Sequence, residues 1–456
     1  MHKLQRRLLL PQKVSPHLFD HKLQAFLVGR IWIAEKMPFH PDTITYHIHA
    51  HFIEQFQGIT EKNSCRRCGS QNLQKFDCSQ CKGSCSYCLD CIIMGRISRC
   101  TKLLRWVGPP IHIQLKSPIM TWQGTLTPSQ KMVADEAVRH EKDHLIHAVT
   151  GAGKTEILFP ISEDALLKNQ RICVTTPRTD VVLELSPRFQ KAFEKIQVQS
   201  YYGGSEFYKE YSPLIIATTH QLLRFEAAFD VIIVDEADAF PYTFDEKLRQ
   251  AVKKAKKASG RTILVTATPT KLERTRFSQR KCYSFIARRF HGKDLPVPKF
   301  DSLWQYDRQF NQGIIPRKLR NWLIKCVSEN KPFLVFFPSV KLMMVALPLI
   351  QKIEHSILAV HASDPNRKES VQALRDGKVC GLLTTTILER GITIFNLQVA
   401  VVGAENRIFD HAALIQISGR VGRSKDAPSG DLIFFHDGLT RQMDFAVSEI
   451  KRLNRL

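Results

Sequence analysis

Uninterrupted apolar runs recur along the middle of the chain, separated by stretches whose apolar positions have helical spacing. An apolar run without alternation predicts a strand that is buried on both faces. Strands that alternate with helices predict a parallel sheet with helices on both sides. The runs lie at Leu145–Val149, Arg171–Thr175, Leu214–Thr218, Val231–Asp235 and Thr262–Thr266.

The alternation begins again after His291–Pro298, a stretch rich in proline and charge that is typical of a linker. Further strands are expected at Phe333–Phe337, Ile357–Val360, Cys380–Thr384, Val399–Gly403 and Asp431–Phe435. The pattern therefore predicts an α/β protein with two tandem parallel-sheet domains, at residues 117–290 and 299–456.

The N-terminal part is marked by cysteine instead. Eight of the 12 cysteines lie between residues 65 and 100, mostly in C-x-x-C pairs. In a reducing compartment this spacing indicates metal rather than disulfides, so we expect an N-terminal segment at 1–60 and a zinc-binding module at 61–116. The candidate ligands are Cys65, Cys68, Cys78, Cys81, Cys85, Cys88, Cys91 and Cys100.

Two arrangements of these thiolates are compatible with tetrahedral zinc. The favoured one places Cys65 and Cys68 opposite Cys78 and Cys81 across one ion. The remaining four cysteines then hold a second ion. The alternative pairs the first two cysteines with Cys88 and Cys91, and leaves the others structural.

The charge balance narrows the range of partners. The chain has 66 Lys and Arg against 43 Asp and Glu, a net charge of +23, and a pI near 9.6. Such an excess favours a polyanion, and nucleic acid fits better than a membrane surface. No apolar run reaches the roughly 18 residues of a spanning helix, and residues 1–11 are too short in apolar content for a secretory signal. A cytoplasmic protein is expected.

A glycine-rich loop joins the first strand of the central pattern to a helix. Gly151 and Gly153 let backbone N–H groups turn toward an anion at a helix N-terminus. Lys154 can reach terminal phosphates and Thr155 can ligate Mg²⁺. The sequence therefore predicts an ATP site, although Ala148 replaces the usual first glycine. The expected contacts are Thr150, Gly151, Ala152, Gly153, Lys154 and Thr155.

Two adjacent carboxylates end the strand that begins at Val231. Buried carboxylates need a cation, and Mg²⁺ at a nucleotide is the natural one. Asp235 is expected to hold the metal through water. Glu236 is expected to orient and deprotonate the attacking water.

Gln130 has two possible roles. With Thr127 it satisfies the spacing of a helix capping box. The role we favour is recognition of the adenine edge by its amide, with Trp122 as a stacking partner, because the phosphate loop follows within one helix and one strand.

In the second domain, Gln416, Arg420 and Arg423 are spaced three to four residues apart and fall on one helix face. Two guanidiniums on such a face can clamp a phosphate that the first domain holds. A nucleotide bound between the domains would then close them, and hydrolysis would release them.

The order of these stretches resembles superfamily 2 helicases. The matches are A-V-T-G-A-G-K-T, T-P-R, G-G, T-T-H-Q-L-L, D-E-A-D, T-A-T and Q-I-S-G-R-V-G-R. The resemblance implies two RecA-like domains, with Arg423 as the arginine finger, Arg420 on the γ-phosphate and Gly391 near the nucleotide. It also implies nucleic-acid contacts, or coupling to them, by Arg178, Gly204, Thr219, Thr266, Thr268, His361, Thr384 and Thr385.

Four stretches are similar to the ComFA family of late competence ATPases. They are the knuckle C-x-x-C-G, the run Tyr87–Arg96, the tetrad Gly153–Glu156 and the stretch His291–Pro298. The replication-restart helicase PriA is a more distant relative. The resemblance implies a zinc-binding ATPase, stimulated by single-stranded DNA, that drives a transforming strand through the channel ComEC from the inner face of the membrane. ComFC and DprA would be associated proteins. A PriA-like helicase is the alternative.

Overall fold

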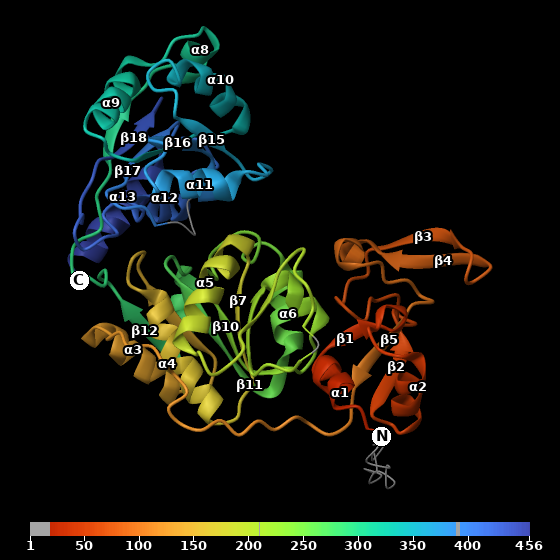
Figure 1. Cartoon of the computed structure of the whole chain (residues 1–456). Coiled ribbons are helices and arrows are strands. Elements are labelled where there is room, and N and C mark those ends of the chain that lie inside the picture. Colours follow the sequence, from red (N-terminus) through yellow and green to blue (C-terminus); the bar gives the residue numbers. More distant parts are fainter. Residues whose placement is uncertain (1–18, 209, 389–392) are drawn as a thin grey trace.

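The computed structural model describes residues 19–208, 210–388 and 393–456. Two parallel sheets form two lobes, and the N-terminal part forms a separate body beside the first lobe (Figure 1). Gly391, which was predicted to lie near the nucleotide, and residues 1–11 lie outside the described residues. The predicted α/β fold with two tandem parallel sheets is confirmed.

Lobe 1 is built on a seven-stranded sheet with the order β12-β6-β11-β10-β7-β9-β8, in which neighbouring strands are parallel. The strands are β6 (His144–Ala148), β7 (Ile172–Thr176), β8 (Gln199–Tyr201), β9 (Leu214–Thr218), β10 (Phe229–Val234), β11 (Lys256–Thr266) and β12 (Tyr283–Ile286). The helices are α3 (Pro128–Arg139), α4 (Lys154–Leu167), α5 (Thr179–Ala192), η4 (Thr219–Arg224), α6 (Glu246–Ala255) and α7 (Lys271–Gln279).

Lobe 2 is built on a six-stranded sheet with the order β13-β18-β17-β14-β16-β15, also with parallel pairs. The strands are β13 (Lys299–Ser302), β14 (Phe333–Phe336), β15 (Leu358–Val360), β16 (Gly381–Thr384), β17 (Gln398–Val402) and β18 (Leu432–His436). The helices are α8 (Tyr306–Asn311), α9 (Arg317–Ser328), α10 (Val340–Ile350), α11 (Arg367–Arg375), η5 (Thr386–Leu388), α12 (His411–Ser418) and α13 (Arg441–Asn454).

The N-terminal part contains a three-stranded antiparallel sheet, ordered β1-β5-β2, and a separate hairpin of β3 and β4. Its elements are α1 (His21–Leu27), β1 (Ile31–Ile33), η2 (Ala34–Lys36), α2 (Pro41–His49), β2 (Ile53–Gln57), β3 (Leu73–Cys78), β4 (Gly83–Cys88), η3 (Leu89–Met94) and β5 (Lys102–Trp106). Because β5 pairs with both β1 and β2, the sheet crosses residue 60. We therefore treat residues 19–106 as one unit, the cysteine module.

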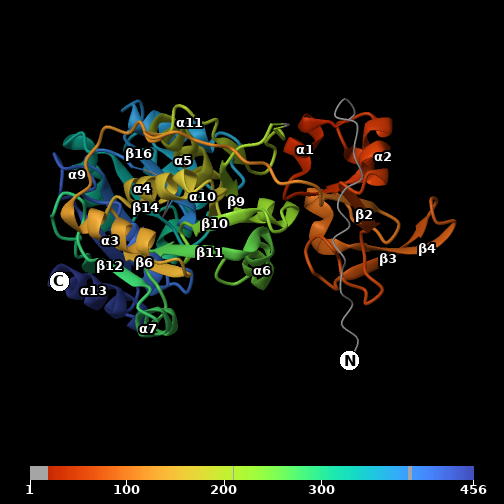
Figure 2. The same cartoon turned by 90° about the horizontal axis from the view of Figure 1, so that it is seen from below.

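The cysteine module lies beside α6 in both views, on the β8 and β9 side of lobe 1 (Figures 1 and 2). Residues 107–126 then run along lobe 1 without a helix or strand until α3. This segment is attached to lobe 1, since the Thr121 N–H donates to the Ala192 carbonyl at 2.8 Å.

Candidate nucleotide cleft and metal clusters

The phosphate loop turns between β6 and α4 through two left-handed glycines. Gly151 has a φ of 85° and Gly153 a φ of 73°. A Cβ at Gly153 would collide with the amide of Gln130. Glycine is therefore required here for both conformation and space. The turn presents the N-terminus of α4, which begins at Lys154, to the cleft.

A cavity of about 380 Å³ opens at this loop and has walls from both lobes. Lobe 1 contributes Gln130, Thr150, Gly151, Gly153, Lys154, Thr155, Asp235 and Glu236. Lobe 2 contributes Thr393, Gln416, Arg420 and Arg423. The structure thus brings together residues that lie more than 200 positions apart in the sequence. Ala152 lies in the same loop but is fully buried beneath it.

Gln416 bridges the two lobes at this cavity. Its side-chain oxygen accepts a hydrogen bond from Thr150 Oγ1 at 3.1 Å, and its nitrogen donates to Asp238 Oδ2 at 3.2 Å. Asp238 also accepts from the hydroxyl of Thr268. Gln416 therefore connects the phosphate loop to the ends of β10 and β11, where the predicted coupling residues Thr266 and Thr268 lie.

Asp235 is only 7 % exposed. Burial and, to a smaller extent, the negative charge of Glu236 raise its pKa to about 6, while Lys154 opposes this shift. Glu236 itself has a left-handed backbone, with φ at 53°. Such a conformation costs about 1 kcal/mol or more in a residue with a side chain, and it is typical of functional sites.

The oxygen donors at the cleft suit Mg²⁺. Thr155 offers a hydroxyl and Asp235 a buried carboxylate, and Mg²⁺ takes hard oxygen ligands of this kind together with substrate phosphates. The high pKa of Asp235 shows that the buried carboxylate lacks sufficient compensating charge, which a divalent cation would supply.

The arginines of lobe 2 enter the cleft from the end of α12. Arg420 is 2 % exposed, and burial lowers the pKa of Arg423. Arg423 Nε donates to the Gly419 carbonyl at 3.1 Å and Nη1 to Thr393 Oγ1 at 3.2 Å. The guanidinium is thereby held against the cavity wall, within the space that a triphosphate would share.

Arg188, Arg289 and Phe290 are three of the residues at or beside the cleft that were not predicted from the sequence. Arg188 of α5 donates to Thr155 Oγ1 at 3.0 Å and pairs with Glu156. Arg289 fastens the connector between the lobes to the turn at Val421. Phe290 lines the cavity. None of the three lies in a motif with a recognisable spacing, and only the fold brings them to the site.

Gln130 fulfils the expected capping role, and recognition of adenine by its amide stays a prediction. Its oxygen accepts from the Thr127 N–H at 2.8 Å in a capping box, and its nitrogen donates to the Ala152 carbonyl at 2.8 Å. Trp122 instead packs edge-on against Phe159, with ring centroids 5.4 Å apart. Among the described residues that line the cavity, Phe290 is the aromatic one, so it replaces Trp122 as the candidate for base stacking.

The predicted strand contacts divide by exposure. Gly204 is exposed with open space around it, His361 and Thr385 are half-buried, and Arg178 reaches across the lobes to the Ile387 carbonyl at 3.3 Å. Thr219 and Thr384 are fully buried. Their hydroxyls bond to Thr175 and to the Val360 carbonyl, so these two side chains support their turns, and contact of the turns with a strand stays a prediction.

The eight cysteines form two clusters, and the favoured pairing was wrong. The inner cluster is Cys65, Cys68, Cys88 and Cys91, and the outer cluster is Cys78, Cys81, Cys85 and Cys100. Within each cluster the candidate ligand atoms lie within 4.8 Å of one another. The alternative arrangement had the inner cluster right but missed the outer one. The hairpin explains both results, because β4 returns beside β3 and carries Cys88 back to the first knuckle.

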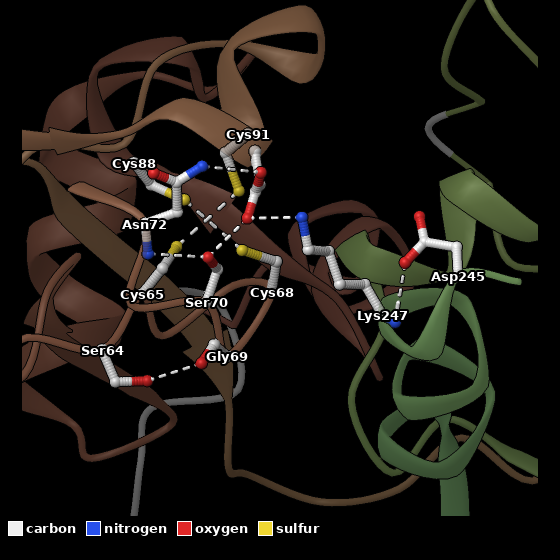
Figure 3. A network of polar contacts seen from close by, with 11 residues as sticks. Ser64, Cys65, Cys68, Gly69, Ser70, Asn72, Cys88, Cys91, Asp245 and Lys247 are labelled. Carbon is white, nitrogen blue, oxygen red and sulfur yellow. Dashed lines mark hydrogen bonds and ion pairs between the residues drawn. The ribbon is translucent and has the colours of Figure 1, made fainter. Parts of the chain in front are cut away.

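Each cluster has the composition and closeness of a tetrahedral zinc site. All eight thiols are free of disulfides. Figure 3 shows how the inner cluster is framed: Ser70 donates to Asp90, and Asp90 pairs with Lys247 of α6 at 2.7 Å. The clusters could therefore hold metal, and the inner one is attached directly to lobe 1.

Two parallel-sheet lobes around such a cleft define a superfamily 2 helicase-type ATPase. Family models agree: a DEAD/DEAH box helicase matches residues 127–275, a helicase conserved C-terminal domain matches 316–425, and a competence protein ComFA N-terminal domain matches 12–105. Yeast Dbp5 bound to RNA and ADP BeF3 has the same fold, with a TM-score of 0.53, 16% identity, and coverage of 72% of this chain and 88% of that one.

The chain belongs to the competence protein ComFA family. It is 40% identical over 446 residues to the protein of Bacillus subtilis (strain 168), which covers 96% of each chain. It is 38% identical over 398 residues to that of Streptococcus pneumoniae (strain ATCC BAA-255 / R6), covering 86% of this chain and 90% of the relative. The protein is thus a competence-related, helicase-like ATPase.

Proposed function

We propose that this protein is an ATP-driven translocase of single-stranded DNA that powers the import of transforming DNA. The observation that carries the proposal is the cavity shared by the lobes, where Gln416 of lobe 2 is bonded to Thr150 and Asp238 of lobe 1. A nucleotide in that cavity touches both lobes at once, so its hydrolysis changes their spacing. A strand lying across both lobes is then moved.

Different residues of the chain have separate roles in ATP hydrolysis. Lys154 neutralises the terminal phosphates, while Thr155 and Asp235 would hold Mg²⁺. When bound, Mg²⁺ would neutralise charge on the phosphates. Glu236 orients the attacking water and takes its proton, and the guanidiniums of lobe 2 stabilise the charge that develops on the transferred group.

Family membership supports proposals for the metal, the polymer and the protein partners. We propose Zn²⁺ in the cysteine clusters, single-stranded DNA as the polymer, and ComEC, ComFC and DprA as partners at the inner face of the membrane. None of the described helices combines the length and the apolar character needed to cross a bilayer. Any association with a membrane would therefore depend, within the described residues, on peripheral contacts.

ATP turnover with and without single-stranded DNA tests the proposal. Stimulation by the strand, with little displacement of a duplex, is the expected result. Efficient displacement would favour the PriA-like helicase instead. Lys154→Ala should abolish turnover but retain strand binding, and Arg423→Ala should lower turnover by about 10³ to 10⁵. Lys168→Ala, on the exposed end of α4, is the matched control.

A further inference from the structure

Two predicted strand-contacting elements of lobe 1 are attached to the cysteine module. The turn at Gly203 and Gly204 continues to Phe207, whose ring lies 4.7 Å from that of Trp32. Element η4, which begins at Thr219, ends at Arg224. The Arg224 guanidinium lies 4.6 Å from the Phe207 ring and 5.4 Å from the Trp32 ring. Both elements therefore meet at one aromatic contact with the module.

A chain of hydrogen bonds leads from this contact to the inner cluster. Arg224 Nη2 donates to the carbonyl of Met94 at 3.3 Å. The same carbonyl accepts from Arg67 Nη1 at 3.1 Å. Arg67 is 2 % exposed, and it also donates to Cys91 Sγ at 3.3 Å and to the Cys91 carbonyl at 2.8 Å. Only Arg67 and Met94 thus separate a cluster thiol from the end of η4.

Helix α6 holds the opposite side of this connection. Lys254 donates to the Leu223 carbonyl in η4 at 2.7 Å and to the carbonyl of Arg67. Lys247 pairs with Asp90, which lies between cluster residues Cys88 and Cys91 (Figure 3). The position of η4 is therefore fixed by contacts to the loops that carry the cysteines.

The outer cluster provides an internal comparison. Cys78, Cys81 and Cys85 lie on the hairpin of β3 and β4, which points away from lobe 1 (Figure 1), and Cys100 lies just before β5. Cys81 is exposed. Among the described residues, the side-chain hydrogen bonds of the outer cysteines join them to one another and to the Ser86 carbonyl, and not to lobe 1. A change at this cluster has no comparable route to η4.

We propose that metal in the inner cluster sets the grip of lobe 1 on single-stranded DNA, with Arg67 and Arg224 as the positioning residues that transmit its effect. The inference rests on the proposed function and adds to it a structural route from the inner cluster to η4. Metal holds the four sulfurs to one ion. Without it they take up protons and are no longer tied together, so loss of metal loosens Cys91 and the Met94 carbonyl. Arg224 then loses a fixed acceptor, and η4 loses its anchored end.

The nucleotide site should be insensitive to this change. None of the residues that line the ATP cavity comes from the cysteine module. Metal occupancy is therefore expected to alter affinity for the strand but not for the nucleotide.

The first experiment uses Arg224→Gln in the full-length protein. We expect unchanged zinc content and unchanged binding of a fluorescent ATP analogue, but about tenfold weaker binding of a labelled oligonucleotide, within the range typical of coupled sites. Arg249→Gln, an exposed arginine of α6 that bonds to Glu246, is the matched control and should change none of these quantities. Unchanged strand affinity in Arg224→Gln overturns the inference.

The second experiment removes metal from one cluster at a time. Cys68→Ser and Cys81→Ser should each lose one zinc, but only the first should weaken strand binding and speed hydrogen exchange at residues 219–224. Adding Cys68→Ser to Arg224→Gln should cause no further loss, since both act through one route. Additive effects, or equal weakening by Cys81→Ser, contradict the route. Failure of the wild-type protein to bind single strands would instead refute the proposed function, and the inference with it.

Discussion

Arg289 Nη1 donates a hydrogen bond to the carbonyl oxygen of Val421 at 2.8 Å, and this bond crosses the junction between the lobes. The same nitrogen donates to the Gly422 carbonyl at 2.6 Å. The two carbonyls belong to the residues that separate Arg420 from Arg423. Arg289 is 2 % exposed, and burial lowers its pKa to about 10, with Arg423 as a smaller cause. The connector between the lobes thus holds the turn that carries the phosphate clamp.

Arg289→Gln should therefore impair the clamp more than the binding of nucleotide by lobe 1. We expect kcat to fall by about 10- to 100-fold with KM for ATP changed little, because misplaced arginines act mainly in the transition state. Arg289→Lys should restore part of the loss by keeping one donor. Arg288→Gln, at the exposed neighbouring position, should leave kcat unchanged. A normal kcat in Arg289→Gln would show that the turn between Arg420 and Arg423 keeps its conformation without Arg289.

The raised pKa of Asp235 makes stability depend on pH. Its pKa is about 6 in the folded protein against 3.8 ordinarily. Between these values the folded state binds the proton and the unfolded state does not, so the nucleotide-free protein loses stability as pH rises toward 6 and then levels off. Asp235→Asn should remove this contribution, which is on the order of 3 kcal/mol.

Urea unfolding of both proteins between pH 4 and 7.5 would measure this difference, compared at each pH because other groups titrate too. As pH falls below about 6, the free energy of unfolding of the wild-type protein should rise relative to that of Asp235→Asn. Turnover of the wild type should fall over the same interval, because protonation removes a magnesium ligand. Parallel stability curves for the two proteins would refute the assignment of the shift to Asp235.

Arg188 lies where it can weaken the binding of Mg²⁺ at Thr155. Its bond to Thr155 Oγ1, at 3.0 Å, uses the oxygen that the metal needs, and its charge occupies the same neighbourhood. Arg188→Gln should therefore lower the Mg²⁺ concentration for half-maximal binding of a fluorescent ADP analogue, by about threefold to tenfold. Lys191→Gln, exposed on the same helix, is the control. Weaker nucleotide binding without Mg²⁺ would show that Arg188 contacts phosphate instead.

The sequence predicted the interior of the two sheets well because central parallel strands are buried on both faces. Leu214–Thr218 was predicted at the residues where β9 lies, and all five of its residues are buried. Strands β8, β12 and β13 were missed. They lie at sheet edges and they are short. β12 alternates buried with partly exposed positions and β13 has only exposed or partly exposed ones, so no apolar run marks them.

The site was predictable where one local stretch supplies several groups, as in the phosphate loop. It was not predictable where the fold alone creates the contact. Arg188 reaches Thr155 from another helix, and the cysteine pairing depends on the return of one hairpin strand. Spacing in the sequence cannot distinguish paired from interleaved knuckles, because both place four thiolates within reach of an ion.

Gly419 gives the sharpest test of the closed cleft. It follows α12 in ordinary right-handed helical backbone, with φ at −67°, so alanine is acceptable there in isolation. A Cβ at this position would lie 2.5 Å from the Cβ of Thr150 in the phosphate loop, which is too close for the lobes to meet as they do. Gly419→Ala should therefore hold the lobes apart.

We expect Gly419→Ala to lower ATP turnover by about 100-fold or more, since a displacement of about 1 Å at a reacting centre has effects of this size. Its free energy of unfolding should not fall, because alanine is favoured over glycine in helical backbone by about 0.5 to 1 kcal/mol. Gly438→Ala, in a lobe 2 loop with nothing within 4 Å of the added carbon, is the matched control. Fluorescence energy transfer between labelled lobes would report closure on nucleotide binding. Normal closure and normal ATP turnover in Gly419→Ala would show that the contact between Thr150 and the α12 turn is not part of the hydrolytic state. Gln416 would then have to reach the phosphate loop in a different arrangement of the lobes.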